Sequence, residues 1–243
     1  THVGARTYNM LEFYKDGFIG DECTNSTTEW HGGKDTEEQF IFNLKTNDRI
    51  LNYYNTKKLT YEFNEYGHRS KNVTDIDLDN YILFVGCSHT SGVGNYLEDT
   101  YPYLVSKQLN VDYYNLSISG SGIDVQLHNL FNWLVRYKPP RYLVWQWTLE
   151  PRVIIADREN KLQVVGSWSN IKEHTDFLLA GKTVNYFKTK RELAKNTIDN
   201  LPINTIQIDV FPNLNAIFYQ KIDLARDLLH YGRKSNQIIS NAI

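Results

Sequence analysis

Residues 81–94, which read YILFVGCSHTSGVG, constrain the fold of this chain more than any other segment. Five apolar or aromatic residues lead directly into Gly86-Cys87-Ser88-His89, and more small residues follow. A short apolar run that ends at a glycine is typical of a strand buried on both faces, as in a parallel sheet. In open α/β folds, ligands bind at the carboxyl edge of such a sheet. Ser88 is therefore a candidate nucleophile placed at that edge.

The chain after residue 94 alternates between helix and strand patterns. Apolar residues recur at helical spacing in residues 98–110 and 123–137. Strand patterns cover residues 111–116, 141–148 and 204–210. This alternation predicts a three-layer α/β/α sandwich with a mainly parallel sheet.

The other segments carry weaker patterns. Residues 1–79 lack a clear repeat and are predicted to form an N-terminal extension or covering subdomain, with substrate selection as a second possible role; residues 80–243 form the main domain. Within the extension we expect a polar loop over 24–34, a short helix over 35–43 and an edge strand within 53–63. Later segments favour an extended region over 162–168, a helix over 188–200, and a mostly helical end over 221–243 that is interrupted at 230–232.

Composition limits the class of protein. Hydrophobic residues make up 41% of the 243 residues and aromatic residues 14%, which is enough for a core. Lys and Arg number 26 against 28 Asp and Glu, and without a basic run this argues against a nucleic-acid surface. No apolar stretch approaches 18 residues, so no membrane span is expected, and no signal peptide is visible. Cys23 and Cys87 are expected to be free thiols.

Three separated segments carry the groups that serine chemistry requires. Ser88 follows the first strand, Gly120 follows the second, and Asp227 and His230 lie near the C-terminus. A serine hydroxyl needs an adjacent base, and histidine has a suitable pKa. A carboxylate on the other ring nitrogen fixes the tautomer of that histidine. Residues three apart, such as Asp227 and His230, can lie on the same side of a turn.

These segments resemble the sequence blocks of the SGNH hydrolases, the GDSL esterase/lipase family. The first block matches at residues 86–88, with Cys87 where the family has Asp; the second matches at Gly120, and the last at Asp227 and His230. The resemblance covers residues 80–243 and implies an SGNH/flavodoxin-like fold. It implies that Ser88 is the nucleophile, that His230 is general base and then acid, and that Asp227 orients it. It also implies an oxyanion hole formed by the backbone N–H groups of Ser88 and Gly120.

The third block departs from the family, which places an asparagine side chain in the oxyanion hole after the third strand. Residues 145–148 read WQWT and contain no asparagine. Thr148 is the preferred substitute and Gln146 the other candidate. Because loss of one such donor typically costs about 10²–10³ in rate, a slow enzyme is one reading of this departure.

Each residue also has a structural interpretation. A serine at a strand-to-helix turn commonly caps the helix, and it is the combination of three blocks that favours catalysis. Arg152 is a candidate clamp for a substrate carboxylate or a member of an ion pair. Trp147 is a candidate sugar platform or a core residue. His89 is expected to be structural and to point away from the site.

The predicted function is hydrolysis of an ester through a serine acyl-enzyme, with a small-molecule or carbohydrate substrate and O-acetyl groups on carbohydrate preferred. No cofactor is implied, because no His/Cys cluster has zinc spacing and no Gly-Lys-Ser/Thr follows Gly94. Thr90 rules out a Gly-x-Ser-x-Gly elbow around the serine. The alternative is a catalytically weak or inactive SGNH-like module that serves binding or structural assembly. The altered third block favours this alternative, and the Ser/Asp/His set opposes it.

Overall fold

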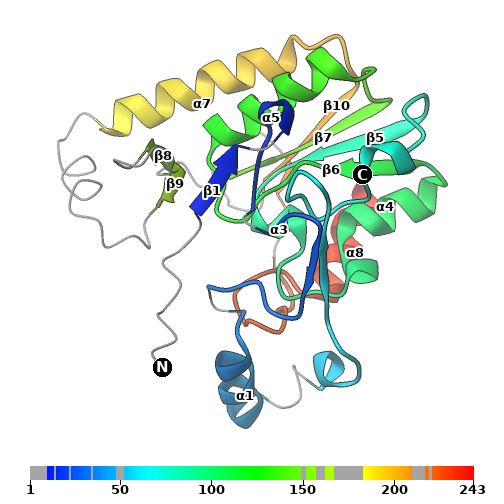
Figure 1. The fold of residues 1–243 in the computed structure, drawn as a ribbon, viewed down its shortest axis with the longest axis vertical. Helices are drawn as coiled ribbons and strands as arrows, with labels where there is room; N and C mark the ends of the chain where they lie inside the picture. The colour runs from blue at the N-terminus through cyan, green and yellow to red at the C-terminus, as the bar shows by residue number, and fades with distance from the viewer. Residues whose placement is uncertain are drawn as a thin grey trace.

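The computed structural model describes residues 10–13, 15–21, 23–33, 35–47, 52–148, 152–156, 162–166, 183–209, 217–218 and 221–243. Figure 1 shows a central sheet with helices on both faces. Its five strands run parallel in the order β11 (Ile217–Phe218), β10 (Thr205–Asp209), β7 (Tyr142–Trp147), β5 (Tyr81–Val85) and β6 (Asp112–Asn115). The strands predicted near residues 81, 111, 141 and 204 are therefore confirmed.

Strand β5 is buried on both faces, as its apolar run predicted. Its residues alternate between two core clusters. Tyr81, Leu83 and Val85 belong to one cluster, and Ile82 and Phe84 belong to the other. Because β5 pairs with both β6 and β7, the strand order reverses around its carboxyl end.

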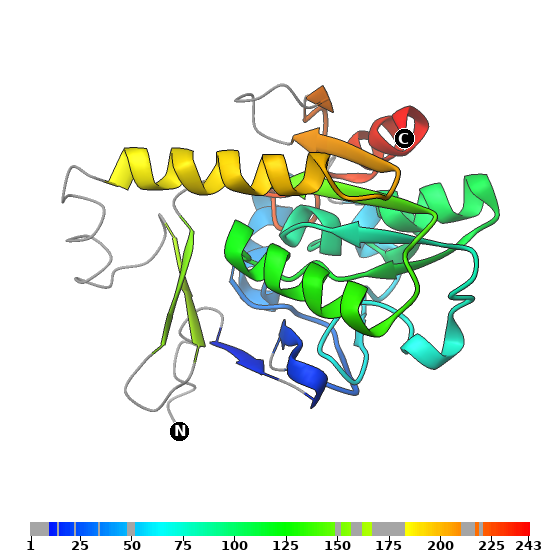
Figure 2. The same cartoon turned by 90° about the horizontal axis from the view of Figure 1, so that it is seen from above.

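Four helices form the outer layers of the sandwich (Figures 1 and 2). Helices α5 (Ile123–Arg136) and α7 (Thr183–Asp199) contribute Trp133 and Ile198 to the first cluster. Helices α4 (Tyr101–Leu109) and α8 (Arg233–Ala242) contribute Val105 and Ile239 to the second. The chain thus has the predicted three-layer α/β/α fold.

The C-terminal segment differs from its prediction. Residues 221–232 form a loop, and helix α8 begins only at Arg233. Leu228 has a φ of 56°, a left-handed conformation that interrupts a helix. The Asp223 carboxylate accepts hydrogen bonds from the backbone N–H groups of Ser235 at 2.8 Å and Lys234 at 2.9 Å. This carboxylate therefore caps α8 and fixes where the loop ends.

The N-terminal segment contributes strands to two small sheets outside the central one. Strands β1 (Met10–Phe13) and β2 (Ile19–Asp21) join β8 (Val153–Ala156) and β9 (Leu162–Val165) in an antiparallel sheet of order β2-β1-β9-β8, which the sequence did not predict. Strand β9 confirms the extended region within its described part; residues 167–168 lie outside the described residues. Strands β3 (Ser26–Thr28) and β4 (Tyr61–Phe63) pair with each other.

One N-terminal prediction needs correction and two are confirmed. The polar loop over 24–34 contains strand β3, and Lys34 lies outside the described residues. An edge strand within 53–63 is present as β4, and Tyr53–Asn55 form the 3-10 turn η2. Helix α1 (Glu37–Thr46) is present and begins at Thr36, whose side chain accepts from the Gln39 N–H at 3.2 Å. The remaining short turns are η1 (Lys15–Gly17), η3 (Val73–Asp75) and η4 (Leu97–Asp99).

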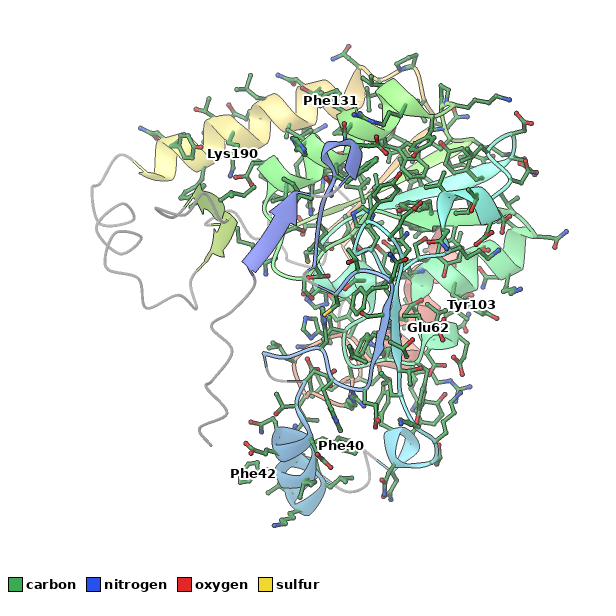
Figure 3. All side chains as sticks on the ribbon, in the orientation of Figure 1. Phe40, Phe42, Glu62, Tyr103, Phe131 and Lys190 are labelled. Carbon is green, nitrogen blue, oxygen red and sulfur yellow. The ribbon has the colours of Figure 1, made fainter. Side chains whose placement is uncertain are left out.

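Residues of the N-terminal segment pack onto the main sheet. Phe18, Tyr66 and Val73 belong to the same core cluster as Tyr81 and Trp133. Helix α1 stands away from the sheet, with Phe42 61% exposed while Phe40 packs on a separate small cluster (Figure 3). The division of the chain at residue 79 stays a prediction. Cys23 and Cys87 are not joined to each other in a disulfide. Among the described residues, no helix has the length and apolar character to cross a membrane.

Candidate active site

Ser88 is the first residue of the short helix α3 (Ser88–Ser91), directly after β5. It lies at the carboxyl end of the strand around which the sheet order reverses, where open α/β folds form their ligand crevice. The turn requires a glycine at position 86, because a Cβ there would lie 1.9 Å from Thr90 Oγ1. This turn therefore places the Ser88 hydroxyl at the carboxyl edge of the sheet.

The C-terminal loop brings its histidine and aspartate to this hydroxyl. His230 Nε2 lies 2.7 Å from Ser88 Oγ, and His230 Nδ1 lies 2.5 Å from Asp227 Oδ2. All three residues are buried. The other carboxylate oxygen, Asp227 Oδ1, accepts from the backbone N–H groups of Leu229 at 3.0 Å and His230 at 3.1 Å. These bonds close a tight turn that holds the carboxylate against the imidazole.

The environment of Asp227 keeps it ionised. Burial acts to raise its pKa, but charge interaction with His230 and hydrogen bonds from the His230 ring and the loop backbone lower the pKa below its ordinary value. A carboxylate only accepts hydrogen bonds, so His230 Nδ1 carries the proton and donates it. The Nε2 lone pair is then left to accept from the Ser88 hydroxyl.

The loop that carries Asp227 is held against the loop that follows Ser88. The Arg226 N–H donates to Gly94 O at 3.1 Å, and Asn95 Nδ2 donates to Tyr231 O at 2.8 Å. Gly94 has a φ of 77°, and a Cβ there would lie 2.8 Å from the Ala225 Cβ. Only glycine allows this approach, which brings the nucleophile and the base together.

A buried ion pair links the same loop to the N-terminal segment. Arg226 Nε donates to Asp35 Oδ1 at 2.6 Å, and its Nη2 donates to Asp35 Oδ2 at 2.9 Å. Tyr61 Oη donates to the same Oδ2 at 2.5 Å. The guanidinium also lies 3.9 Å from the Trp30 ring centroid. Arg226 directly precedes Asp227, so this pair fixes the loop from the side opposite the sheet.

A second buried arginine holds the loop after Ser88. Arg69 Nη1 donates to the carbonyls of Ser91 at 3.0 Å and Gly92 at 2.7 Å, and its Nη2 donates to Asn95 O at 3.0 Å. The side chain lies over the Tyr61 ring. Burial lowers the pKa of Arg69 from its ordinary value. Backbone carbonyl groups thus replace much of the water that would otherwise solvate the Arg69 guanidinium.

The segment after β6 lies beside the same turn. Asn115 Nδ2 donates to Thr90 O at 3.1 Å, and Ser121 Oγ donates to Gly86 O at 2.9 Å. Gly120 is buried with a φ of 77°. Among the described residues, the backbone N–H groups of Ser88 and Gly120 have no hydrogen-bond acceptor. Both N–H groups therefore remain for a ligand.

The two side chains expected to replace the family's asparagine are engaged elsewhere. Gln146 Oε1 accepts from the Cys87 N–H at 3.0 Å and from Thr90 Oγ1 at 3.0 Å, and its Nε2 donates to Trp147 O. The Thr148 hydroxyl donates to Ser121 O at 3.1 Å. A hydroxyl has one proton to donate, so this bond occupies it. Gln146 and Thr148 support the backbone around the site.

Of the two predicted substrate contacts, that of Trp147 needs correction, and that of Arg152 stays a prediction. Trp147 is 1% exposed and belongs to the core beside Trp145, where a ligand has no access to its ring. Arg152 is buried, and its Nη1 donates to Thr148 Oγ1 at 2.7 Å and to Ser121 O at 3.2 Å. These bonds place it in the support of the loop around Gly120.

Two histidines near the site were missed or misread from the sequence. His89, expected to point away, has its ring centroid 4.8 Å from that of His230 and 4.8 Å from that of Tyr231. His31 comes from the predicted polar loop, and its Nε2 lies 2.7 Å from Ser119 Oγ. No motif surrounds His31, and its partner Ser119 lies 88 positions further along the chain, so no local pattern indicates the contact.

Among the described residues of the site, no arrangement suits a metal ion. Across the described ranges, no group of three His, Cys, Asp or Glu side chains is placed to hold one.

A cleft of about 400 Å³ lies elsewhere, lined by residues that include Glu62, Lys71 and Tyr103 (Figure 3). Neither Ser88 nor His230 lines that cleft.

Comparisons with known proteins give structural neighbours only. No protein-family model matches the chain, and no curated protein matches it. The psychrotrophic esterase EstA from Pseudoalteromonas sp. is 16% identical, with a TM-score of 0.43 over 67% of this chain and 93% of that one. An acetyl xylan esterase from the rumen bacterium Butyrivibrio proteoclasticus is 14% identical, with a TM-score of 0.38 over 67% and 61% of the two chains. A family two carbohydrate esterase from Clostridium thermocellum, solved with cellohexaose, is 11% identical, with a TM-score of 0.38 over 67% and 62%.

Proposed function

We propose that the protein is a serine esterase of SGNH type in which Ser88, His230 and Asp227 form a catalytic triad. The observation that carries the proposal is the continuous chain of contacts from Ser88 Oγ to His230 Nε2 at 2.7 Å and from His230 Nδ1 to Asp227 Oδ2 at 2.5 Å. Nucleophile, base and orienting carboxylate are the three groups that acyl transfer requires.

The chemistry follows from these positions. His230 Nε2 takes the Ser88 proton as Oγ attacks the ester carbonyl carbon, and the carbonyl oxygen becomes an oxyanion. We propose that the N–H groups of Ser88 and Gly120 bind this oxyanion. His230 then protonates the leaving alkoxide, which departs as the alcohol and leaves an acyl group on Ser88. Water, deprotonated by His230, attacks that acyl group. The bond between the acyl carbon and Ser88 Oγ then breaks, His230 returns the proton to Oγ, and the carboxylic acid is released.

Among esters, we propose O-acetyl groups on carbohydrate as the substrate class. Trp145 and Trp147 are buried and cannot serve as sugar platforms. Trp30 is partly exposed and stacks on Arg226, next to Asp227, which makes it the described aromatic side chain best placed to meet a sugar ring at the rim of the site. An acetyl group is small, which suits a site whose serine and histidine are almost covered.

The decisive experiment measures p-nitrophenyl acetate hydrolysis by the wild type and Ser88→Ala, with fluorophosphonate labelling of both. We expect turnover and label in the wild type, and loss of both in the variant. Release of acetate from acetylated xylan, compared with hydrolysis of p-nitrophenyl butyrate, then tests the substrate class. A folded wild type that neither turns over nor takes the label contradicts the proposal and favours the inactive binding module.

A further inference from the structure

His31 reaches the active site from outside the region that resembles the SGNH family. It precedes helix α1, and its Nε2 lies 2.7 Å from Ser119 Oγ. Ser119 directly precedes Gly120, whose N–H is a proposed oxyanion donor. That N–H belongs to the planar peptide unit between Ser119 and Gly120, so whatever fixes Ser119 also fixes the direction of the donor.

The His31 ring is itself held in place. It lies against Tyr61 and Phe63 of strand β4, with ring centroids 5.3 Å and 5.5 Å away. The His31 backbone N–H donates to Asp35 Oδ2 at 3.4 Å, the same oxygen that accepts from Tyr61 Oη and Arg226 Nη2. The ring contacts with Tyr61 and Phe63, together with the hydrogen bond of the His31 backbone N–H, fix the orientation of the imidazole toward Ser119.

The ring is neutral under ordinary conditions. Burial lowers the pKa of His31 to about 4; Asp35 opposes this shift, and Arg69 and His230 add to it. A neutral imidazole forms one directed hydrogen bond at Nε2 without adding positive charge near His230. This matters because His230 must itself become positively charged during acyl transfer.

We propose that His31 is a positioning residue for the oxyanion hole: through its hydrogen bond to Ser119 it orients the Gly120 N–H toward the developing oxyanion. This inference rests on the proposed esterase function. It assigns part of the N-terminal segment to the active site and gives a reason why that site retains its oxyanion donors without the family's asparagine.

The test uses five single variants of the full chain with p-nitrophenyl acetate as substrate. We expect His31→Ala and Ser119→Ala each to lower kcat by about 10- to 100-fold, with KM nearly unchanged, because a donor displaced by about 1 Å loses transition-state stabilisation. His31→Gln places an amide where Nε2 lies and is expected to recover most of the rate, whereas His31→Asn does not reach Ser119. His128→Gln, on an exposed histidine, serves as the matched control and leaves kcat unchanged.

The double variant His31→Ala/Ser119→Ala separates positioning from general destabilisation. If the two residues act through one hydrogen bond, the double variant is no slower than either single variant. Multiplying rate losses, or no rescue by His31→Gln in a variant with wild-type thermal stability, would overturn the inference. Wild-type activity and fluorophosphonate labelling decide the esterase proposal separately. An active, labelled wild type with fully active His31 variants refutes only the role of His31.

Discussion

The candidate site has two halves. They differ in whether their polar side chains contact one another or bond to the surrounding backbone. In the nucleophile half, Ser88, His230 and Asp227 contact one another directly. In the proposed oxyanion half, Gln146 of β7 and Thr148 after it bond to the surrounding backbone, and among the described residues the N–H groups of Ser88 and Gly120 have no acceptor. One half therefore depends on side-chain identity, and the other on backbone placement. We therefore expect side-chain substitutions to lower activity more in the first half than in the second.

The largest effect is expected from Asp227→Asn. The amide occupies the place of the carboxylate but no longer selects the His230 tautomer that leaves Nε2 free to accept. We expect kcat for p-nitrophenyl acetate to fall by about 10⁴-fold, as loss of the orienting carboxylate does in serine proteases. Circular dichroism should confirm an intact fold. A loss of less than tenfold would mean that the nucleophile half does not depend on its side chains.

The next prediction concerns stability. It tests the ion pair between Arg226 and Asp35, which holds the loop that carries Asp227. Asp35→Asn leaves the Arg226 guanidinium buried without its carboxylate. Removing one partner of a buried pair typically costs 3–5 kcal/mol, and we expect the free energy of unfolding in urea to fall by about that amount. The matched control, Asp79→Asn, breaks the exposed pair with Lys138 and should change it by less than about 1 kcal/mol. Equal effects of the two variants would contradict the assigned role of Asp35.

A smaller effect is expected in the pH dependence of stability, since both halves contain neutral buried histidines. Burial lowers the pKa of His31 to about 4 and the pKa of His89 well below its ordinary value of 6.5. Below pH 6.5 the unfolded chain binds protons that the folded chain excludes, so stability falls as the pH drops from 6.5 toward 4. Each such histidine contributes a slope of up to about 1.4 kcal/mol per pH unit.

Urea unfolding of the wild type and His31→Gln at pH 5 and pH 6 measures this contribution. We expect the difference in unfolding free energy between the two pH values to shrink in the variant by up to about 1.4 kcal/mol. An unchanged difference would show that His31 titrates in the folded protein as it does in the unfolded chain.

The smallest effect is expected from Thr148→Val, which removes the hydroxyl and keeps the shape of the side chain. Because that hydroxyl donates to Ser121 O, we expect kcat to change by less than about tenfold. Loss of an oxyanion donor would instead cost about 10²–10³. Steady-state kinetics with p-nitrophenyl acetate distinguish the two outcomes, and the larger loss would move Thr148 into the oxyanion hole.

Local patterns predicted the sheet and the order of its elements. The apolar run before Gly86 and the alternation after it reflect burial on both faces of one strand, which sequence periodicity records directly. The approach of His230 to Ser88 followed from a family resemblance. The C-terminal loop was misread as helix, because the left-handed Leu228 and the Asp223 cap depend on contacts that no local pattern encodes.

The N-terminal part of the site could not be predicted. His31, Asp35 and Arg69 lie in a segment without periodicity, and each acts through a partner at least 22 residues away. Such contacts depend on how distant segments pack. The prediction of Trp147 as a sugar platform was wrong for a related reason. The sequence shows that the residue is aromatic but does not show which side of the sheet it faces.

The ion pair between Arg226 and Asp35 joins positions 191 residues apart. A contact of that span cannot form until residue 226 has been synthesised, and closing so long a loop is slow. We therefore expect the turn that bears Asp227 to be completed late in folding, after the central strands have paired. Under the proposed function, a nascent chain that stops before residue 226 would carry Ser88 without its proposed base, His230, and would show no esterase activity.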